Sequence, residues 1–167
     1  IEYWDGSFWR QVDNTTRRGR GLFAGGQPSP SSQIDYLELS TLGNGQDFGD
    51  LISANANKGA FANSIRAVFI GGGGNSTDMD YVTIASAGNG IDFGNLSQGR
   101  GYVGGAASST RGFGIGGWAS PAVSNRLDFV EIMTLGTAID FGDLFTGCYS
   151  PGCASSPTRA FAYSGAL

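Results

Sequence analysis

One pattern of residues occurs three times along this chain of 167 residues, and it constrains the fold more than any other feature. Each copy has an arginine, an apolar run ending in two glycines, an Asp beside an aromatic residue, and an Asp-Phe-Gly segment. The repeated residues are Arg20, Arg66 and Arg111, then Asp35, Asp80 and Asp128, then Asp47, Asp92 and Asp140. A fourth copy begins at Arg159. Such self-similarity predicts a stack of like units that bury one another's faces.

The spacing within the repeat separates packed structure from loops. The distance from the first to the second repeated Asp is the same in every copy, and so is the distance from that second Asp to the next arginine. Only the segment between the double glycine and the next Asp changes in length, and its copies begin at Gln27, Gly73 and Trp118. Because loops tolerate insertions better than packed strands do, we expect this variable segment to be a surface loop.

Short apolar or alternating stretches follow the repeated arginines and the first repeated aspartates, and Gly, Asn and Ser bound them. This pattern predicts β-strands, and nothing of useful length has a helical period. Gly43-Asn44-Gly45 and Gly88-Asn89-Gly90 predict type I′ hairpin turns, since such turns need positive φ at both central residues. Each unit is then about four short strands in about 45 residues, which is the period of β-propeller blades.

A single four-stranded sheet cannot bury both of its faces, so neighbouring units have to pack on one another. Aromatic residues recur at two positions of the repeat, and we expect them to form the core between units. They are Tyr36, Tyr81 and Phe129 beside the first Asp, and Phe48, Phe93 and Phe141 in the Asp-Phe-Gly segments.

We expect one repeat domain over residues 1–167, with units at about 20–65, 66–110 and 111–158. Residues 159–167 and 1–19 are expected to give a partial blade. In one arrangement the apolar N-terminal stretch joins the strand after Arg159 and closes a small propeller; in the other, further repeats or subunits complete the ring. The first residue is Ile1 and not Met, which is expected of a processed product or of part of a longer chain.

Composition narrows the class of partners. Glycine supplies 29 residues, yet aromatics reach 12%, so the glycines are expected to punctuate strands rather than mark disorder. The net charge is -4 and Lys58 is the sole lysine, so no nucleic-acid partner is expected. The cluster of Arg17, Arg18 and Arg20 is interpreted as a solvated stretch. No run approaches the roughly 20 apolar residues that span a bilayer, so no membrane contact is expected.

The double glycine that ends an apolar strand, followed by a variable loop and an alternating strand, resembles a kelch repeat. The segment Gly43–Leu51 and its copies are similar to the kelch-like repeats of virion proteins of tailed phages, especially marine phages of cyanobacteria. The resemblance covers residues 20 to 165. It implies an all-β, kelch-like β-propeller and a structural role in the virion, as a tail, fibre or decoration component. Its partners would be other virion proteins or further copies of itself. Kelch propellers usually have more blades than this chain has units.

Histidine is absent from the sequence, which removes the usual general base near neutral pH and the usual ligands of copper and zinc. Asp-Phe-Gly also occurs in protein kinases, but three copies at repeat spacing favour a turn in which Asp caps the chain and Gly takes an unusual φ. Gly71–Gly74 lacks the Lys-Ser or Lys-Thr of a phosphate-binding loop. We therefore expect no enzyme activity. The repeated arginines are expected to pair with the repeated aspartates in bridges within or between units.

Two further kinds of site were considered. Oxygen ligands near Asn44, Asp47 and Asp50, or near Asp140 and Asp143, are of the type that binds calcium, although turns explain the same residues and no cofactor is expected. Cys148 and Cys153 flank a Pro-Gly turn that favours a disulfide in an extracellular protein; the alternative is two free thiols.

Residues that differ between copies are where a binding site is expected, because the shared residues are needed for packing. The candidates are Trp118, Tyr102 and Tyr149, since such rings suit sugar faces or protein partners. Trp4 and Trp9 fit core filling equally well. The alternative function is therefore a secreted, lectin-like propeller that binds host-surface glycans through loops unique to each repeat.

Overall fold

The computed structural model describes residues 2–4, 9–11, 19–163 and 165–166, with side chains from residue 19 onward. The described residues form strands and loops without a helix, which confirms the expected all-β class. No helix in this part of the chain is long and apolar enough to cross a membrane. The strands are β1 (Glu2–Trp4), β2 (Trp9–Gln11), β3 (Arg20–Ala24), β4 (Ser31–Glu38), β5 (Gln46–Asn55), β6 (Gly59–Ala62), β7 (Arg66–Ile70), β8 (Asp78–Thr83), β9 (Ile91–Asn95), β10 (Gly104–Ala107), β11 (Arg111–Ile115), β12 (Trp118–Ala119), β13 (Ala122–Val123), β14 (Arg126–Glu131), β15 (Ile139–Asp143), β16 (Gly152–Ser155) and β17 (Ala160–Tyr163).

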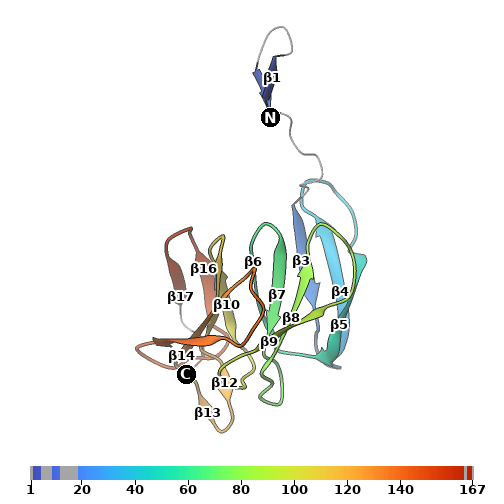
Figure 1. The fold of residues 1–167 in the computed structure, drawn as a ribbon. Coiled ribbons are helices and arrows are strands. Elements are labelled where there is room, and N and C mark those ends of the chain that lie inside the picture. The colour runs from blue at the N-terminus through green and yellow to red at the C-terminus, as the bar shows by residue number, and fades with distance from the viewer. Residues whose placement is uncertain (1, 5–8, 12–18, 164, 167) are drawn as a thin grey trace.

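The strands form several small antiparallel sheets. The first sheet is β3-β4-β5, the second sheet is β6-β7-β8-β9, and the third sheet is β10-β11-β14-β15. β16 and β17 form a terminal hairpin, and β1 pairs only with β2 among the described strands. Figure 1 shows the three sheets and the terminal hairpin side by side in chain order.

The sheets and the sequence repeat are offset by one strand. The second and third sheets begin with β6 and β10, which precede the repeated arginines at the start of β7 and β11. The second and third predicted units therefore start at the second strand of a sheet, whereas the first unit starts at β3, the first strand of its three-stranded sheet. The variable segment after Gly117 is more ordered than a simple loop, because it holds the short hairpin β12-β13.

The strand register explains the constant spacing between the repeated aspartates. The first and second Asp of each copy face each other across two antiparallel strands, as Asp35–Asp47, Asp80–Asp92 and Asp128–Asp140. In each sheet the register shifts at a β-bulge just before the first Asp. An insertion between these two positions would break the pairing, so the spacing is fixed.

The predicted type I′ turns are wrong. Neither Asn44 nor Asn89 has positive φ, and the last pair between β8 and β9 is Tyr81–Ile91, so nine residues separate the paired positions, too many for a two-residue turn. This segment instead lies along β5 of the preceding sheet. Gly88 N donates to Phe48 O at 2.7 Å and Gly90 N to Asp50 O at 2.7 Å. The segment between the two strands is thus an intersheet connection and not a hairpin turn.

We call this contact between consecutive sheets a joint, and it occurs twice. In the second copy, Gly136 N donates to Phe93 O at 2.8 Å and Ala138 N to Asn95 O at 2.7 Å. The glycine of Asp-Phe-Gly makes room for the approach, since a Cβ on Gly94, at φ +134°, would overlap the carbonyl oxygen of Gly136.

Each joint encloses a hydrophobic core, and the repeated aromatics of the first two copies pack there as predicted. The prediction is wrong for the third copy, in which Phe129 and Phe141 belong to neither core and Phe141 is 56% exposed, because no further sheet of the described residues packs on that face. Tyr36 packs edge-on against Phe48 at 5.9 Å between ring centroids, and Tyr81 packs in the same way against Phe93 at 6.1 Å. The first core contains Ile34, Phe48, Leu51, Ala67, Phe69 and Val82. The second core contains Phe61, Val68, Ile70, Met79, Tyr81, Phe93, Leu96, Val103, Val130, Ile132 and Ala138.

Alanine in place of Gly94 tests the joint, because Gly142→Ala is a matched control. Gly94 and Gly142 have φ values of +134° and +142°, but nothing described lies within 4 Å of a Cβ on Gly142. Both variants should lose about 1–3 kcal/mol of unfolding free energy from backbone strain. Gly94→Ala should lose about 1–3 kcal/mol more, because its methyl group strikes the next sheet. Urea denaturation measures the difference, and equal losses would show that the joint is loose.

Candidate functional site

Three of the predicted binding residues lie together in an aromatic cluster formed by Tyr102, Trp118 and Tyr149. Tyr102 lies between β9 and β10, Trp118 begins β12, and Tyr149 lies between β15 and β16. The Tyr149 ring meets Tyr102 edge-on at 5.8 Å and Trp118 at 6.0 Å between centroids. Tyr102 is 40% exposed and Trp118 36% exposed, so the cluster leaves part of its ring surface open to solvent.

Backbone hydrogen bonds fix this cluster. Trp118 N donates to Gly101 O at 2.7 Å, and Gly101 N donates to Trp118 O at 3.0 Å. Ser150 N donates to Tyr102 O at 2.8 Å, which ties the third segment to the first. The backbone hydrogen bonds between these segments therefore fix the positions of the three rings relative to one another.

The backbone at Tyr102 is unusual. Its φ is +57°, close to the values at the equivalent positions of the other linkers, +58° at Asn57 and +52° at Ser150. Asn tolerates this left-handed conformation, whereas a bulky aromatic residue there is an outlier that costs about 1–2 kcal/mol. Because positive φ recurs at this position in all three linkers, the conformation is a feature of the linker, and the aromatic side chain is what distinguishes this copy. The side chains of Trp4 and Trp9 lie outside the described residues.

A second set of polar residues is buried between linker and sheet. Lys58 Nζ lies 3.6 Å from Asp80 Oδ2, and Arg100 Nη2 lies 3.1 Å from Asp128 Oδ2. Each cation comes from the linker before a sheet, and each Asp is the first repeated Asp of that sheet. Burial raises the pKa of Asp80, although the nearby Lys58 opposes this effect. Removing one partner of such a pair costs about 3–5 kcal/mol, which marks these groups as structural.

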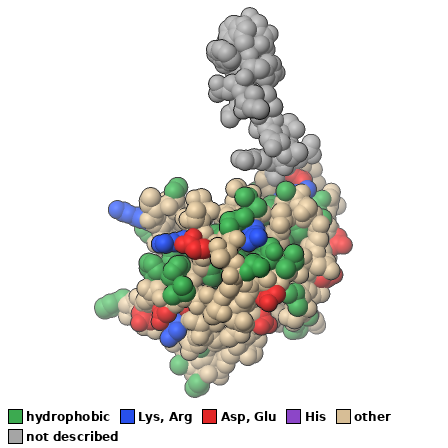
Figure 2. Space-filling model, viewed as in Figure 1, with side chains coloured by type: hydrophobic (Ala, Val, Ile, Leu, Met, Phe, Trp, Pro, Cys, Tyr) green, Lys and Arg blue, Asp and Glu red, His purple; other side chains and the backbone are tan. Residues whose placement is uncertain are grey.

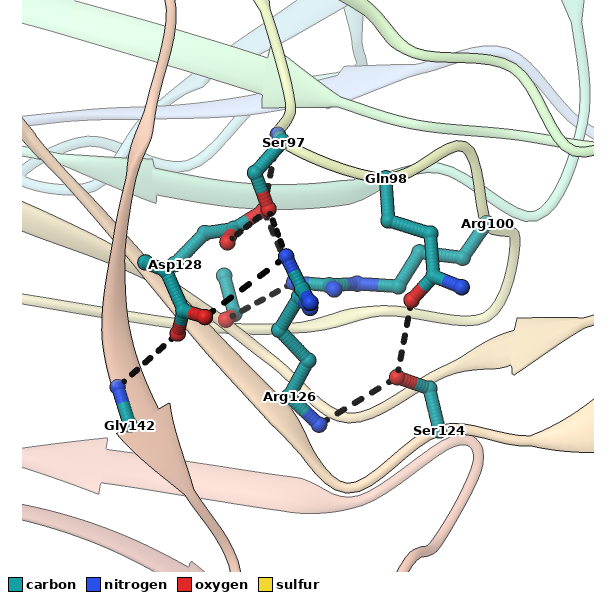
Figure 3. A network of polar contacts seen from close by, with 9 residues as sticks. Ser97, Gln98, Arg100, Ser124, Arg126, Asp128 and Gly142 are labelled. Carbon is teal, nitrogen blue, oxygen red and sulfur yellow. Dashed lines mark hydrogen bonds and ion pairs between the residues drawn. The ribbon is translucent and has the colours of Figure 1, made fainter.

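Figure 3 shows the surroundings of the Arg100–Asp128 pair. Asp128 also accepts hydrogen bonds from the backbone N and the hydroxyl of Ser97. Arg100 Nη2 donates to Gly114 O at 3.3 Å, and Arg126 Nη1 donates to Ser97 Oγ at 3.0 Å. The network joins the linker between the second and third sheets to the third sheet, so these groups hold the structure together rather than face solvent.

The expected pairing of repeated arginines with repeated aspartates is wrong. The register places Arg20 opposite Glu38 and Arg111 opposite Glu131, away from Asp35 and Asp128. Arg20 Nε contacts Glu38 at 3.1 Å, and Arg111 Nε contacts Glu131 at 2.8 Å. The sequence reasoning missed Lys58 and Arg100 as the true partners; the only signal was that each is a cation unique to one linker.

The first three repeated arginines instead lie over aromatic rings, and two of them also reach the next sheet. Their guanidinium carbons lie 4.8 Å, 4.4 Å and 5.4 Å from ring centroids in the pairs Arg20–Tyr36, Arg66–Tyr81 and Arg111–Phe129. Nη1 of Arg20 donates to Ile84 O at 2.8 Å, and Nη1 of Arg66 donates to Ile132 O at 3.1 Å. Arg159, in the fourth copy, is exposed. Two arginines thus fasten the joints.

The second repeated aspartates form the predicted turn caps. Oδ1 accepts from the glycine N two residues on at 3.0–3.1 Å, in the pairs Asp47–Gly49, Asp92–Gly94 and Asp140–Gly142. Asp50 Oδ1 accepts from Ser32 Oγ at 2.9 Å. Within the described ranges, no group of three or more acidic or cysteine side chains is arranged to hold a metal ion. Of the residues considered as calcium ligands, Asp47 and Asp140 thus use a carboxylate oxygen to cap a turn.

Cys148 and Cys153 are free thiols in the structure, unlike the disulfide favoured by the Pro-Gly turn. Cys148 is buried and Cys153 is half-buried. Burial raises the pKa of the Cys153 thiol, and the neighbouring Cys148 adds to this effect. A raised pKa lowers the fraction of reactive thiolate near neutral pH, which does not favour a nucleophilic role.

Comparison with known proteins adds no assignment. No model of a protein family matches the chain, and no match is found among curated proteins.

Replacing Tyr102 with Asn should remove the ring at little cost in stability. Asn favours the left-handed backbone, which offsets the lost ring contacts, so the free energy of unfolding should stay within about 1 kcal/mol of the original. Tyr102→Val removes the same ring but places a β-branched residue at φ +57°, and should lose about 1–2 kcal/mol more. Urea denaturation of both variants tests this, and a large loss in Tyr102→Asn would mean that the ring serves folding.

Proposed function

We propose that this chain is a non-enzymatic structural and binding protein of a tailed-phage particle, a tail, fibre or decoration component that acts through protein–protein contacts. The observation that carries the proposal is that the repeated residues serve to hold consecutive sheets together. Its shared arginines, aspartates, phenylalanines and glycines make intersheet joints and turns, as in the bonds from Gly88 and Gly136 to the preceding sheet. Residues used in this way build an extended assembly and leave no shared group for chemistry.

A kelch-like β-propeller is the architecture that we propose for the complete assembly. Two successive joints use the same backbone hydrogen bonds, so the rotation from one sheet to the next is repeated. The first strands of successive sheets also follow one another in space, since β6 contacts β10 and β10 contacts β16. Contacts between the first strands of successive sheets are expected of blades arranged around an axis, and in this way they support the proposal.

The aromatic cluster is the proposed contact surface for a partner. Rings at Tyr102 and Trp118 supply rigid apolar area at low entropic cost, which suits another virion protein. The same exposed rings favour the second candidate, a glycan of a host surface, because sugars stack on aromatic faces. Strain at Tyr102 supports either ligand class over a purely structural role.

The proposal requires the chain in the particle. Antibodies raised against residues 19–163 should label purified virions of the encoding phage in electron micrographs. If the antibodies detect the protein in the lysate but do not label purified virions, the virion role is contradicted.

A glycan array distinguishes the two ligand classes. Binding of the original chain that disappears in Tyr102→Asn and Trp118→Ala would favour the glycan-binding function. If no glycan is bound, while cross-linking in virions joins Tyr102 or Trp118 to another virion protein, the protein-binding function is supported. Ile65→Asp is a control with an exposed apolar residue outside the cluster.

A further inference from the structure

The third sheet ends in an open copy of the joint. Phe141 is 56% exposed, whereas its counterparts Phe48 and Phe93 are 3% and 1% exposed. β15 is the edge strand of the sheet, and nothing described lies within 4 Å of a Cβ position on Gly142. A groove of about 670 Å³ lies between this sheet and the terminal hairpin. In Figure 2, hydrophobic side chains gather beside basic and acidic groups over the region of the terminal hairpin.

The groove carries the same groups as the two filled joints. Here the rings of Phe113, Phe129 and Phe141 pack against one another, with distances of 5.2–6.4 Å between centroids. Arg111 lies over Phe129, but no next sheet offers it the carbonyl that Arg20 and Arg66 find. Arg111 contacts only Glu131 among the described charged groups. This face of the third sheet therefore has the kinds of residue that the first and second sheets contribute to their joints with the following sheet.

The first sheet presents the second half of the same joint. Leu39 is 70% exposed, whereas Ile132 at the equivalent position of the third sheet is 0% exposed. Gly43-Asn44-Gly45 has the same residues as Gly88-Asn89-Gly90, which binds β5 in the first joint. Nothing described lies within 4 Å of a Cβ position on Gly43. One molecule thus has both complementary halves, at opposite ends of its row of sheets.

We propose that the third sheet of one molecule docks on the first sheet of a second copy, head to tail, through a joint of the kind found twice within the chain. By equivalence, Gly43 N donates to Phe141 O, Gly45 N donates to Asp143 O, and Arg111 donates to Leu39 O. Leu39 fills the groove beside Phe141. The inference rests on the proposed structural role, and it names a second copy of the chain as the partner.

Docking requires that β17 of the terminal hairpin be displaced. β17 and β3 follow equivalent arginines, Arg159 and Arg20, so β3 of the incoming copy takes the place of β17 beside β16. All four residues of β17 are exposed, whereas its counterpart β7 is almost wholly buried. Displacement of β17 therefore exposes little apolar surface that was covered before. Because the two halves differ, the contact is heterologous and gives rings or open chains rather than a closed two-fold pair.

The test is the mass in solution, measured by light scattering and sedimentation velocity across a concentration series. The original chain should exceed the 17.3 kDa of a single chain as concentration rises. Leu39→Asp and Phe141→Asp alter opposite halves of the joint, and each variant alone should remain monomeric. Ile65→Asp, at an exposed position between β6 and β7, is the matched control and should associate like the original.

Mixing the two variants gives the sharpest result. Each keeps one intact half, so an equimolar mixture should form a dimer of one Leu39→Asp and one Phe141→Asp chain, and nothing larger. A monomeric original chain up to its highest soluble concentration would overturn the proposal, as would association that survives both substitutions. Circular dichroism of each variant confirms folding before the masses are compared.

This outcome is independent of the virion assignment. A chain that labels virions but stays monomeric would refute head-to-tail docking and leave the proposed function standing. A chain that associates head to tail but is missing from virions would refute the proposed function and leave head-to-tail docking standing.

Discussion

The close approach of backbone to backbone at the joint is the constraint on which the rest of the structure depends. No single sheet here can bury both faces, so each relies on the next for its core. The approach needs a glycine in Asp-Phe-Gly, because a side chain at Gly49 or Gly94 would meet the following sheet. In the facing segment, Gly136 has a φ of +148°, a conformation that favours glycine, although nothing described lies within 4 Å of its Cβ position. The joint between consecutive sheets therefore explains why the glycine of Asp-Phe-Gly recurs in the sequence.

Charge and aromatic contacts support the joint without creating it. Arg20 and Arg66 fasten one sheet to a carbonyl of the next while stacking on a ring of their own sheet. The linkers add buried cations, Lys58 and Arg100, that compensate the first repeated Asp of the following sheet. Burying these aspartates unpaired would be costly, which is why each linker that precedes a buried repeated Asp carries a cation. The rings of the aromatic cluster, which differ between copies of the repeat, take no part in these contacts.

The repeat allowed the strand content, the capped Asp-Phe-Gly turns and the aromatic core of the first two copies to be predicted, because periodicity reports directly on which residues share a face. It could not show that Phe141 of the third copy is exposed, since that depends on whether another sheet follows. The Asn-Gly segments were misinterpreted, since a local turn preference says nothing about a neighbouring sheet that binds the same backbone. The arginine partners were wrong because register, not residue type, decides which side chains meet across strands. The clustering of Tyr102, Trp118 and Tyr149 was beyond the sequence, as it depends on how three separate linkers converge.

Amide hydrogen exchange measured by NMR in dilute solution tests the central role of the joint most directly. The account predicts that the amides of Gly88, Gly90, Gly136 and Ala138 are protected like those within strands, because each donates to the preceding sheet. The amides of Gly43 and Gly45, in the same segment of the first sheet, should exchange quickly. Equal, fast exchange at all six positions would contradict the account, since the sheets would then not be held together by their repeated residues.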